Sequence, residues 1–492
     1  MRHLFKKGLA VLLAAVLSFG VLTSCGTDQT SGETSQTSAS QQGGAAAISF
    51  TDDEGREIRL NQPCERIISL YSAHTENLFS LGAGEKVIGV NDTSVYPPEA
   101  AFLDVYDYES DPEKVIAAEP DLVLIRPFIT NKAPDFVKAI EKAGITVVSL
   151  YPESFDLFDE YITHLGALVG EEETAKEKLE EFHQNLDEIT QLTSTLTQKQ
   201  KVFFESTEVN LRTITPDSMP AHAISLAGGE NVAQDVEPVK EGSSIAPFGE
   251  ERILSLADEI DVYVSQSGAM NAGGTVHSIS IRPGFDTIKA VKDGRVYLIN
   301  EKIISSPTFR FYKGVRELAR YLYPEVMDSL EDYETDQPAT RRDLANIMVK
   351  AAHLPIYVTS SRYYQQEHKG HTYGLFEDVE WTDPDFDAIE TVVVSGYLDW
   401  EKDGEKEYFR PEDPVTREEL AQAIFLMGDF EGKDATPIQD LEECENQNIV
   451  QIMVDNGVFA LADGNFEPQR TVTQQEIVDA FSKAGPLAQG EE

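Results

Sequence analysis

Cysteine is scarce in this chain of 492 residues, which contains only Cys25, Cys64 and Cys444. The three positions form no CxxC pair, and three cysteines are too few for a disulfide framework or a cysteine-based metal site. Cys64 and Cys444 fall in separate predicted domains, so we predict that both are free thiols. Cys25 stands at the end of an apolar run and has a different role.

Basic residues are greatly outnumbered. Lys and Arg total 40 against 86 Asp and Glu, which gives a formal net charge of −46 at pH 7. A surface of this sign repels phosphate backbones and anionic lipid, so nucleic acid is excluded as a principal partner. The charge keeps an exported protein soluble and suits basic partner surfaces, but it specifies no chemistry.

Signatures of catalysis and of bound metal ions are also missing. There is no GxSxG, HExxH or P-loop motif, so an enzyme is the weakest of the function classes we consider. A zinc or manganese site needs three or four converging ligands. The nine histidines form no such group, and the one tight pair, His368 and His371, is predicted to lie in a solvated loop. We therefore predict no metal site and no resident cofactor.

Long apolar runs are confined to the N-terminus. The run from Gly8 to Leu22 follows three basic residues and ends in LTSC at Cys25. This order is typical of a secretion signal that closes on a lipobox, whose cysteine is diacylated and becomes the mature N-terminus. The alternative is an ordinary secretory signal with a chance cysteine. The run is short for a membrane-spanning helix, and no later stretch is long and apolar enough to span. We expect a signal peptide over residues 1–25 and a lipid-anchored chain on the extracellular face of the cytoplasmic membrane.

Residues 26–47 are almost entirely Gly, Ser, Thr, Gln and Ala. Such a segment cannot bury a core, so it is predicted to be a flexible linker between the lipid and the folded part. About 22 residues of this composition have an average reach of roughly 25 Å.

From residue 66 onward, short apolar runs alternate with helical patterns. Strand, helix and strand in this order build a parallel sheet that is covered on both faces. One such set occupies residues 48–153 and a second occupies 194–330. Between them, residues 154–193 carry one apolar stripe at helical spacing, formed by Ala175, Leu179, Phe182, Leu186 and Ile189. We predict an α/β fold of two Rossmann-like lobes joined by a single long helix. A ligand would bind between them, where the strands end.

Several short motifs of this region follow the pattern of a known family. They are DEGR at 53–56, RIISL at 66–70, TE at 75–76 before LGAG at 81–84, VIGV at 87–90, EPDLV at 119–123 and AVKDGRVY at 290–297. Together they resemble the iron-siderophore, haem and cobalamin family of ABC-transporter substrate-binding proteins, over roughly residues 48–328. The resemblance implies the class III binding-protein fold and delivery of a chelate to a membrane permease.

In that family, one surface glutamate on each lobe docks into arginine pockets of the permease. The matching positions are Glu113 in PEKVI and Glu251 in EERILSL. An acidic residue at a helix start is also favoured by the helix dipole, by about 0.3–1 kcal/mol, which is the structural alternative. Two equivalent placements favour docking, which would speed encounter and fix register. Glu250 competes with Glu251 for the second position.

The loops that follow the strands supply aromatic and basic side chains to the predicted site. Aromatic faces with a few arginines suit a large, flat, partly anionic ligand such as a siderophore chelate, a haem or a corrinoid. His74 is either an axial metal ligand or a hydrogen-bonded loop histidine. The predicted ligand-binding residues are Tyr71, His74, Tyr96, Arg126, Phe128, Arg212, Phe248, Gln266 and Arg310.

Residues 331–492 contain a repeat. FRPE at 409–412 and VTREEL at 415–420 recur as FEPQ at 466–469 and VTQQEI at 472–477, and ATRRDL at 339–344 is an earlier partial copy. Thr before the acidic turn is a helix N-cap, so an all-α domain of helix–loop–helix units is predicted.

The repeats resemble S-layer homology domains, which bind anionic secondary polymers of the cell wall. The resemblance assigns wall binding to Arg341, Trp381, Thr416 and Arg417. Two fairly complete units and a leading half are visible, and the last copy has Gln474 in place of the arginine. The alternative is a degenerate spacer or interaction module.

The function that best fits these features is a lipid-anchored receptor that delivers an iron-siderophore, haem or corrinoid ligand to an ABC importer and is also associated with the cell wall. The alternative is a cell-surface scavenging or adhesion protein that holds ligand at the wall without a dedicated transporter.

Overall fold

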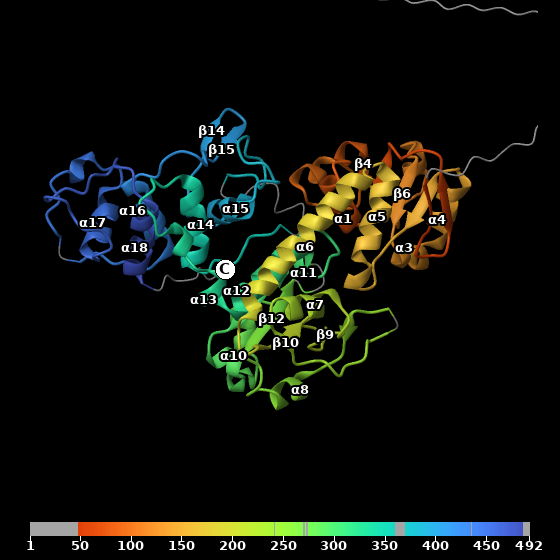
Figure 1. Cartoon of the computed structure of the whole chain (residues 1–492), viewed down its shortest axis with the longest axis horizontal. Coiled ribbons are helices and arrows are strands. Elements are labelled where there is room, and N and C mark those ends of the chain that lie inside the picture. The colour runs from red at the N-terminus through yellow and green to blue at the C-terminus, as the bar shows by residue number, and fades with distance from the viewer. Residues whose placement is uncertain are drawn as a thin grey trace, which may run out of the picture. The chain divides into compact units, whose positions relative to one another are not determined.

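The computed structural model describes residues 48–240, 242–268, 271, 274–359, 370–433 and 435–485. The predicted signal, Cys25, the linker and His368 lie outside the described residues. Figure 1 shows the course of the chain. Within the described ranges, no helix combines the length and the apolar character needed to cross a membrane.

The N-terminal lobe is built on a five-stranded sheet in the order β5-β4-β3-β6-β7, in which every neighbouring pair is parallel. The central strands are short apolar runs that are buried on both faces. Successive residues of β3, β6 and β7 enter two different core clusters, as Leu122 and Val123 do. The strands are β3 (Ile67–Ser69), β4 (Val87–Val90), β5 (Asp104–Val105), β6 (Leu122–Ile125) and β7 (Thr146–Ser149), preceded by the antiparallel hairpin β1 (Ile48–Thr51) and β2 (Glu57–Leu60).

Helices cover both faces of this sheet (Figure 1). They are α1 (Ser72–Ser80), α2 (Glu113–Ala117), α3 (Pro127–Lys132), α4 (Pro134–Lys142) and α5 (Phe158–Val169). The predicted linking helix over 154–193 is interrupted. Gly170 ends α5 in the left-handed conformation, and α6 (Glu172–Ser194) starts two residues later. At 1.5 Å per residue, the 23 residues of α6 span about 35 Å. Its buried residues include Ala175, Phe182, Leu186 and Ile189 of the predicted stripe.

The C-terminal lobe contains a second parallel sheet, in the order β10-β8-β12-β13. Its strands are β8 (Lys201–Glu205), β10 (Glu230–Asn231), β12 (Val262–Ser267) and β13 (Val296–Asn300), and a small antiparallel pair is formed by β9 (Thr213–Ile214) and β11 (Ile245–Ala246). The helices are α7 (Met219–Leu226), α8 (Glu250–Ser255), α9 (Val276–Ser280), α10 (Lys289–Lys292), α11 (Glu301–Ile304), α12 (Phe311–Leu322) and α13 (Pro324–Met327). One apolar cluster continues from the first lobe through α6 into the second.

The C-terminal repeats form a third body with its own core, which we call the repeat module. Its helices are α14 (Arg341–Ala351), α15 (Phe386–Val394), α16 (Arg417–Met427), α17 (Gln447–Asp455) and α18 (Gln474–Ala484). The prediction of an all-helical domain departs from the structure in one detail, because β14 (Glu401–Asp403) and β15 (Lys406–Tyr408) pair as an antiparallel hairpin.

The repeats close on themselves through their backbones. The amide of Ala339 donates to Val472, that of Val472 to Val415, and that of Val415 to Ala339, at 2.9–3.0 Å. Each of these residues precedes a capping threonine, at Thr340, Thr416 or Thr473. The leading half-repeat therefore completes a three-membered ring with the two fuller copies.

Candidate functional site

Three predicted ligand residues meet at the carboxyl edge of the first sheet. Tyr71 is the second residue after β3, and Arg126 and Phe128 follow its neighbour β6. The Arg126 guanidinium lies 4.6 Å from the centre of the Tyr71 ring and 5.0 Å from that of Phe128. Burial raises the pKa of Tyr71 well above its usual value, so the phenol is neutral. Phe128 is 46% exposed. The arrangement presents aromatic surface with one positive charge held against it.

Tyr151 belongs to the same cluster and was missed by the sequence analysis. Its ring lies 6.1 Å from that of Tyr71, and it follows β7, the strand next to β6. The rule that placed Arg126 after β6 applies equally to Tyr151 after β7, so the signal was present in the sequence.

His74 is not a metal ligand, contrary to one of the predicted alternatives. Its side chain is fully buried, and both ring nitrogens are occupied: Nδ1 lies 2.8 Å from the Tyr161 hydroxyl and Nε2 lies 3.0 Å from the Ile125 carbonyl. Because the carbonyl can only accept, Nε2 carries the proton. Burial lowers the pKa of His74 to about 4, which keeps the ring neutral. His74 joins α1 to β6 and does not face a ligand.

Arg310 also has a structural role that the sequence analysis missed. It lies at the start of α12 in the second lobe and forms a bidentate ion pair with Glu76 on α1 of the first lobe, at 2.7 Å for both bonds. Only 6% of Arg310 and 4% of Glu76 is exposed. Next to this pair, the Asn77 amide donates to the Pro307 carbonyl at 2.9 Å. The two lobes are therefore joined by buried polar contacts at this point.

Tyr96 takes part in the same junction. The Arg310 guanidinium lies 3.6 Å from the centre of the Tyr96 ring, and Trp381 of the repeat module packs edge-on against that ring at 5.8 Å. Lys313 on α12 forms an ion pair at 2.5 Å with Asp387 on α15. Tyr96 and Arg310, predicted as ligand residues, and Trp381, predicted as a wall-binding residue, thus lie at a contact among the three bodies. Arg310 is engaged by Glu76 and Tyr96, and Tyr96 by Trp381, while their ligand and wall-binding roles stay predictions.

The second lobe contributes two charged residues that sequence reasoning did not single out. Glu301 and Lys302 follow β13 and are both nine-tenths buried. The Lys302 ammonium donates to the Ser72 hydroxyl of the first lobe at 3.1 Å, and burial lowers its pKa. The negative charge of Glu301 contributes to the raised pKa of Tyr71. The hydrogen bond to Ser72 places the start of α11 beside the residue next to Tyr71.

The remaining predicted ligand residues lie in different surroundings within the second lobe. Gln266 is buried and accepts a hydrogen bond from Ser305, so it belongs to the interior of the second lobe. Phe248 packs against Phe203 at 5.1 Å with the Arg252 guanidinium over its ring. Arg212 is half-buried in the loop that follows β8, and its ligand role stays a prediction.

The two predicted docking glutamates are both exposed, at the starts of equivalent short helices. Glu113 opens α2, and Glu251 is the second residue of α8, after the equally exposed Glu250. Their docking role stays a prediction.

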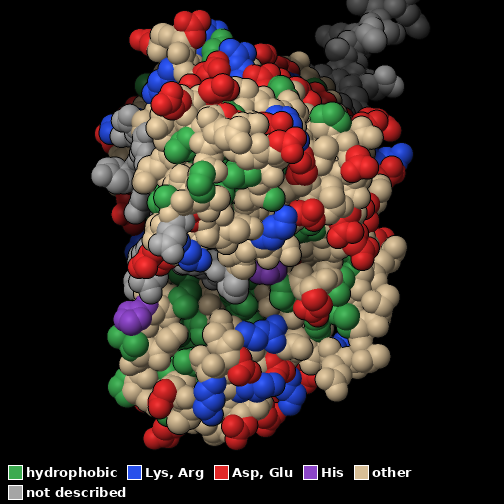
Figure 2. Space-filling model, turned by 90° about the vertical axis from the view of Figure 1, so that its left-hand side faces the viewer, with side chains coloured by type: hydrophobic (Ala, Val, Ile, Leu, Met, Phe, Trp, Pro, Cys, Tyr) green, Lys and Arg blue, Asp and Glu red, His purple; other side chains and the backbone are tan. Residues whose placement is uncertain are grey.

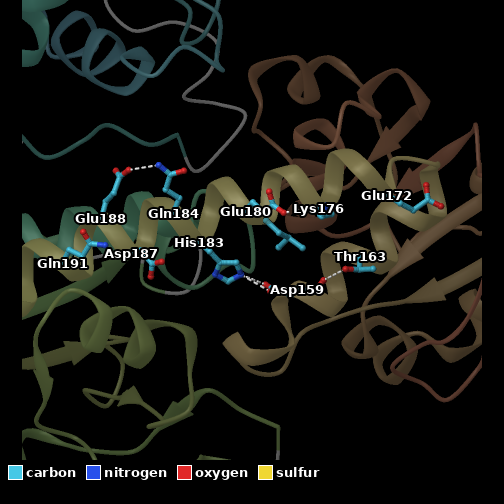
Figure 3. Close-up of a pocket in the computed structure, with 11 residues that line it drawn as sticks. Asp159, Thr163, Glu172, Lys176, Glu180, His183, Gln184, Asp187, Glu188 and Gln191 are labelled. Atoms are coloured by element: carbon cyan, nitrogen blue, oxygen red, sulfur yellow. Dashed lines mark hydrogen bonds and ion pairs between the residues drawn. The ribbon is translucent and has the colours of Figure 1, made fainter.

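A groove with a volume of about 950 Å³ lies between α5 and α6 and is lined only by residues of these two helices. Figure 3 shows His183 reaching from α6 toward Asp159 on α5, to which it is bonded at 2.9 Å. Most of its charged residues are acidic and none is aromatic apart from the histidine. It offers no surface for the ligand class predicted above. Its lining residues are Asp159, Thr163, Glu172, Lys176, Leu179, Glu180, His183, Gln184, Asp187, Glu188 and Gln191.

The arginines predicted to bind wall polymer make their contacts mostly with other residues of the repeat module. Arg341 donates to the Phe409 carbonyl at 2.8 Å and pairs with Glu419, and burial lowers its pKa. Arg417 stacks over Phe459 and Phe466. Thr416 caps α16, and its hydroxyl accepts from the Glu419 amide at 3.2 Å. These contacts explain the repeat pattern without a ligand, and wall binding stays a prediction.

His371 is not in a solvated loop, which corrects the prediction for this residue. It is fully buried and bridges Glu390, at 2.9 Å, and Glu407. Burial lowers its pKa, but the two carboxylates outweigh burial, and the net pKa is raised above the usual value. The triad joins α15 to the hairpin strand β15.

On the face drawn in Figure 2, acidic side chains occur from top to bottom, and Lys and Arg side chains lie among them, with one group in the lower part. Within the described residues, no group of three or more His, Cys, Asp or Glu is placed to hold a metal ion.

Known proteins resemble the two-lobed part of the chain. Residues 67–303, just under half of the chain, match the family described as Periplasmic binding protein. The chain is 26% identical over 323 residues to "Uncharacterized ABC transporter substrate-binding lipoprotein YvrC" of Bacillus subtilis, covering 64% of this chain and 96% of that protein. It is 26% identical over 263 residues to the vitamin B12-binding protein of Vibrio cholerae, covering 53% and 90%. A solved structure of a possible iron-binding periplasmic protein from Staphylococcus epidermidis is 27% identical, with a TM-score of 0.47 over 53% of this chain and 99% of that one.

Both relatives are named as binding proteins, and neither name describes an enzyme. The matched segment runs from β3 into α11 and leaves out the β1–β2 hairpin, α12, α13 and the repeat module.

Proposed function

We propose that residues 48–330 bind a large, flat, partly anionic ligand of the iron-siderophore, haem or corrinoid type and deliver it to an ABC permease. The observation that carries this proposal is the cluster of Tyr71, Arg126 and Phe128 at the carboxyl edge of the first sheet. It lies inside the segment that matches a binding-protein family.

Ligand class is tested by titrating the purified full-length chain with haem, followed by absorbance, and with cobalamin and ferric siderophores, followed by equilibrium dialysis. The expected result is saturable binding of one class. Arg126→Ala is expected to weaken it by about 10- to 100-fold, because a charge-assisted hydrogen bond contributes about 1.5–3 kcal/mol. The matched control is Lys132→Ala, which removes an exposed positive charge six residues away at the end of α3. Binding of free zinc alone would overturn the ligand class.

Delivery through Glu113 and Glu251 is the second part of the proposal. Reversing both charges to lysine should abolish ligand uptake by cells while ligand affinity of the purified protein is unchanged, because docking and ligand binding use different surfaces. The matched control reverses Glu177 and Glu188, two exposed glutamates of α6. Glu250→Lys alone tests the competing position.

Unchanged uptake in the double variant would argue against docking at these residues. It would favour the alternative, a scavenging protein that holds ligand at the surface without a dedicated transporter.

Lipid anchoring at Cys25 is the third part. Cys25→Ala should move the protein from the membrane fraction to the culture medium, whereas Cys64→Ala should leave it in the membrane fraction.

Attachment of the repeat module to anionic wall polymer is tested by sedimentation with purified cell walls. Loss of sedimentation in Arg417→Ala would support it, and equal sedimentation of the variant would count against it.

A further inference from the structure

The repeat module packs against the first lobe at the loop that follows β4. Tyr96 and Pro98 of this loop are buried, and Tyr96 belongs to the same apolar cluster as the core of the module. Trp381 packs edge-on against the Tyr96 ring at 5.8 Å. Gly374 lies so close to Pro98 that a Cβ atom on the glycine would overlap the proline ring. The fit at this point therefore leaves no room for an added side chain.

The same module is fixed to the second lobe. Lys313 of α12 forms its ion pair with Asp387 of α15 at 2.5 Å. The side-chain amide of Asn300, the last residue of β13, donates to the Val358 carbonyl at 2.9 Å. Val358 also packs against the apolar cluster of the lobes. The module therefore bridges the two lobes, and a rigid movement of one lobe relative to the other must break one of these two sets of contacts.

Both sets of contacts lie where strands end at the proposed ligand site. β4 is the parallel neighbour of β3, so the loop after β4 leaves the same edge of the sheet as Tyr71. Asn91 holds this loop at the edge, because its backbone amide donates to the Ser69 carbonyl at 3.0 Å. Asn300 marks the carboxyl edge of the second sheet. A large ligand between these edges would compete with the packed module for space.

Charge opposes the packing of the module on the lobes. Both parts of the chain carry many more acidic than basic residues, so they repel each other. Glu99 follows Pro98, and Glu380 precedes Trp381, so a glutamate flanks the contact on each side. Burial raises the pKa of Glu99, and the charge of Glu380 adds to this effect. The module is thus held by close packing against an unfavourable charge, which suits a contact that opens and closes.

We propose that the repeat module is an autoinhibitory brace. While it packs against both lobes, it restrains their relative movement and lowers their affinity for ligand, and it must separate from one lobe before ligand enters. This inference rests on the proposed function, because it concerns access to the same site.

The test compares two glycine variants of the purified full-length chain in detergent. Gly374→Ala places a methyl group against the Pro98 ring and should separate the module from the first lobe. Gly404→Ala is the matched control, because Gly404 has a φ of 67° against 76° for Gly374 but open space around it. Both variants carry Trp400→Phe, which leaves Trp381 as the sole tryptophan of the chain. Acrylamide quenching of the Trp381 emission then measures the separation without any ligand.

Ligand access is measured on the same variants with haem, cobalamin and ferric siderophores. Gly374→Ala should raise the quenching constant of Trp381, and Gly404→Ala should leave it unchanged. The ligand that binds should bind about fivefold or more tightly to Gly374→Ala than to Gly404→Ala, because the apparent dissociation constant exceeds the intrinsic one by the reciprocal of the open fraction.

Asp387→Asn is the second variant and serves as the test if Gly374→Ala does not fold. It breaks the ion pair with Lys313 on the second lobe, so the lobes are again free to move. Its affinity for ligand should exceed that of Asp403→Asn, which removes the same charge from the exposed strand β14.

Increased quenching in Gly374→Ala with the same ligand affinity as Gly404→Ala would overturn the inference and leave the proposed function intact. Equal quenching in the two variants, or weaker ligand binding to Gly374→Ala, would also overturn it. Absence of binding of every probe to every variant would count against the proposed function itself, and the inference would fall with it.

Discussion

Breaking the ion pair between Arg310 and Glu76 tests how the lobes are held together. The pair crosses from α12 to α1 with two bonds of 2.7 Å, and both residues are more than nine-tenths buried. Arg310→Met leaves the Glu76 carboxylate buried without its partner, which costs about 3–5 kcal/mol. The variant also loses the stacking of the guanidinium on Tyr96. With a urea slope of about 2–3 kcal/mol/M, the unfolding midpoint should fall by roughly 1–2 M.

The assay is urea unfolding followed by circular dichroism, with two further variants. Arg316→Met removes an exposed arginine from the same helix and should change the stability by less than about 0.5 kcal/mol. Adding Glu76→Gln to Arg310→Met removes the uncompensated charge and should recover at least about 2 kcal/mol of the loss. If Arg310→Met unfolds at the same urea concentration as Arg316→Met, or if the second substitution recovers nothing, the pair does not join the lobes as argued.

Three further outcomes are expected. Burial lowers the pKa of His74 to about 4, against about 6.5 in the unfolded chain. The free energy of unfolding should therefore fall by up to about 3 kcal/mol as the pH drops from 6.5 to 4. His74→Gln should lack this loss when unfolding curves at pH 7 and pH 4.5 are compared. The raised pKa of His371 gives a pH dependence of the opposite sign. Its contribution to the free energy of unfolding is complete below about pH 6.5 and is lost as the pH rises through the pKa of the folded state. Thermal unfolding of His371→Gln should lack that pH dependence. Asp387→Asn leaves the Lys313 ammonium buried without its partner and should loosen the repeat module from the lobes. The expected readout is a red shift in the fluorescence emission of Trp381, which packs at this contact. The emission of Trp381 is obtained by subtracting the spectrum of Trp381→Phe.

The two parallel sheets could be predicted because their strands are short apolar runs separated by helical patterns, which sequence displays directly. Exposure of Glu113 and Glu251 followed from their positions at helix starts. Arg126 and Tyr71 were found because residues that follow neighbouring parallel strands share one edge of the sheet.

The same rule did not reveal the contacts of Arg310 with Glu76 and of Tyr96 with Trp381, because position in the chain does not show which other body packs against a side chain. The prediction that His371 lies in a solvated loop was wrong for a related reason. Its neighbours in sequence are polar, and only the folded module brings Glu390 and Glu407 to both sides of its ring. The break at Gly170 lies before the apolar stripe, which falls wholly within α6, so the stripe predicted this helix but not where it begins.

The closed ring of backbone bonds in the repeat module has a consequence for synthesis. The amide of Ala339, near the beginning of the module, takes its acceptor from Val472, near its end. During translation, the first unit must wait without this partner until nearly the whole chain has emerged from the ribosome. Nonsense mutations at or before Val472 should therefore remove the backbone acceptor of Ala339, so that loss of the end of the module also destabilises its beginning.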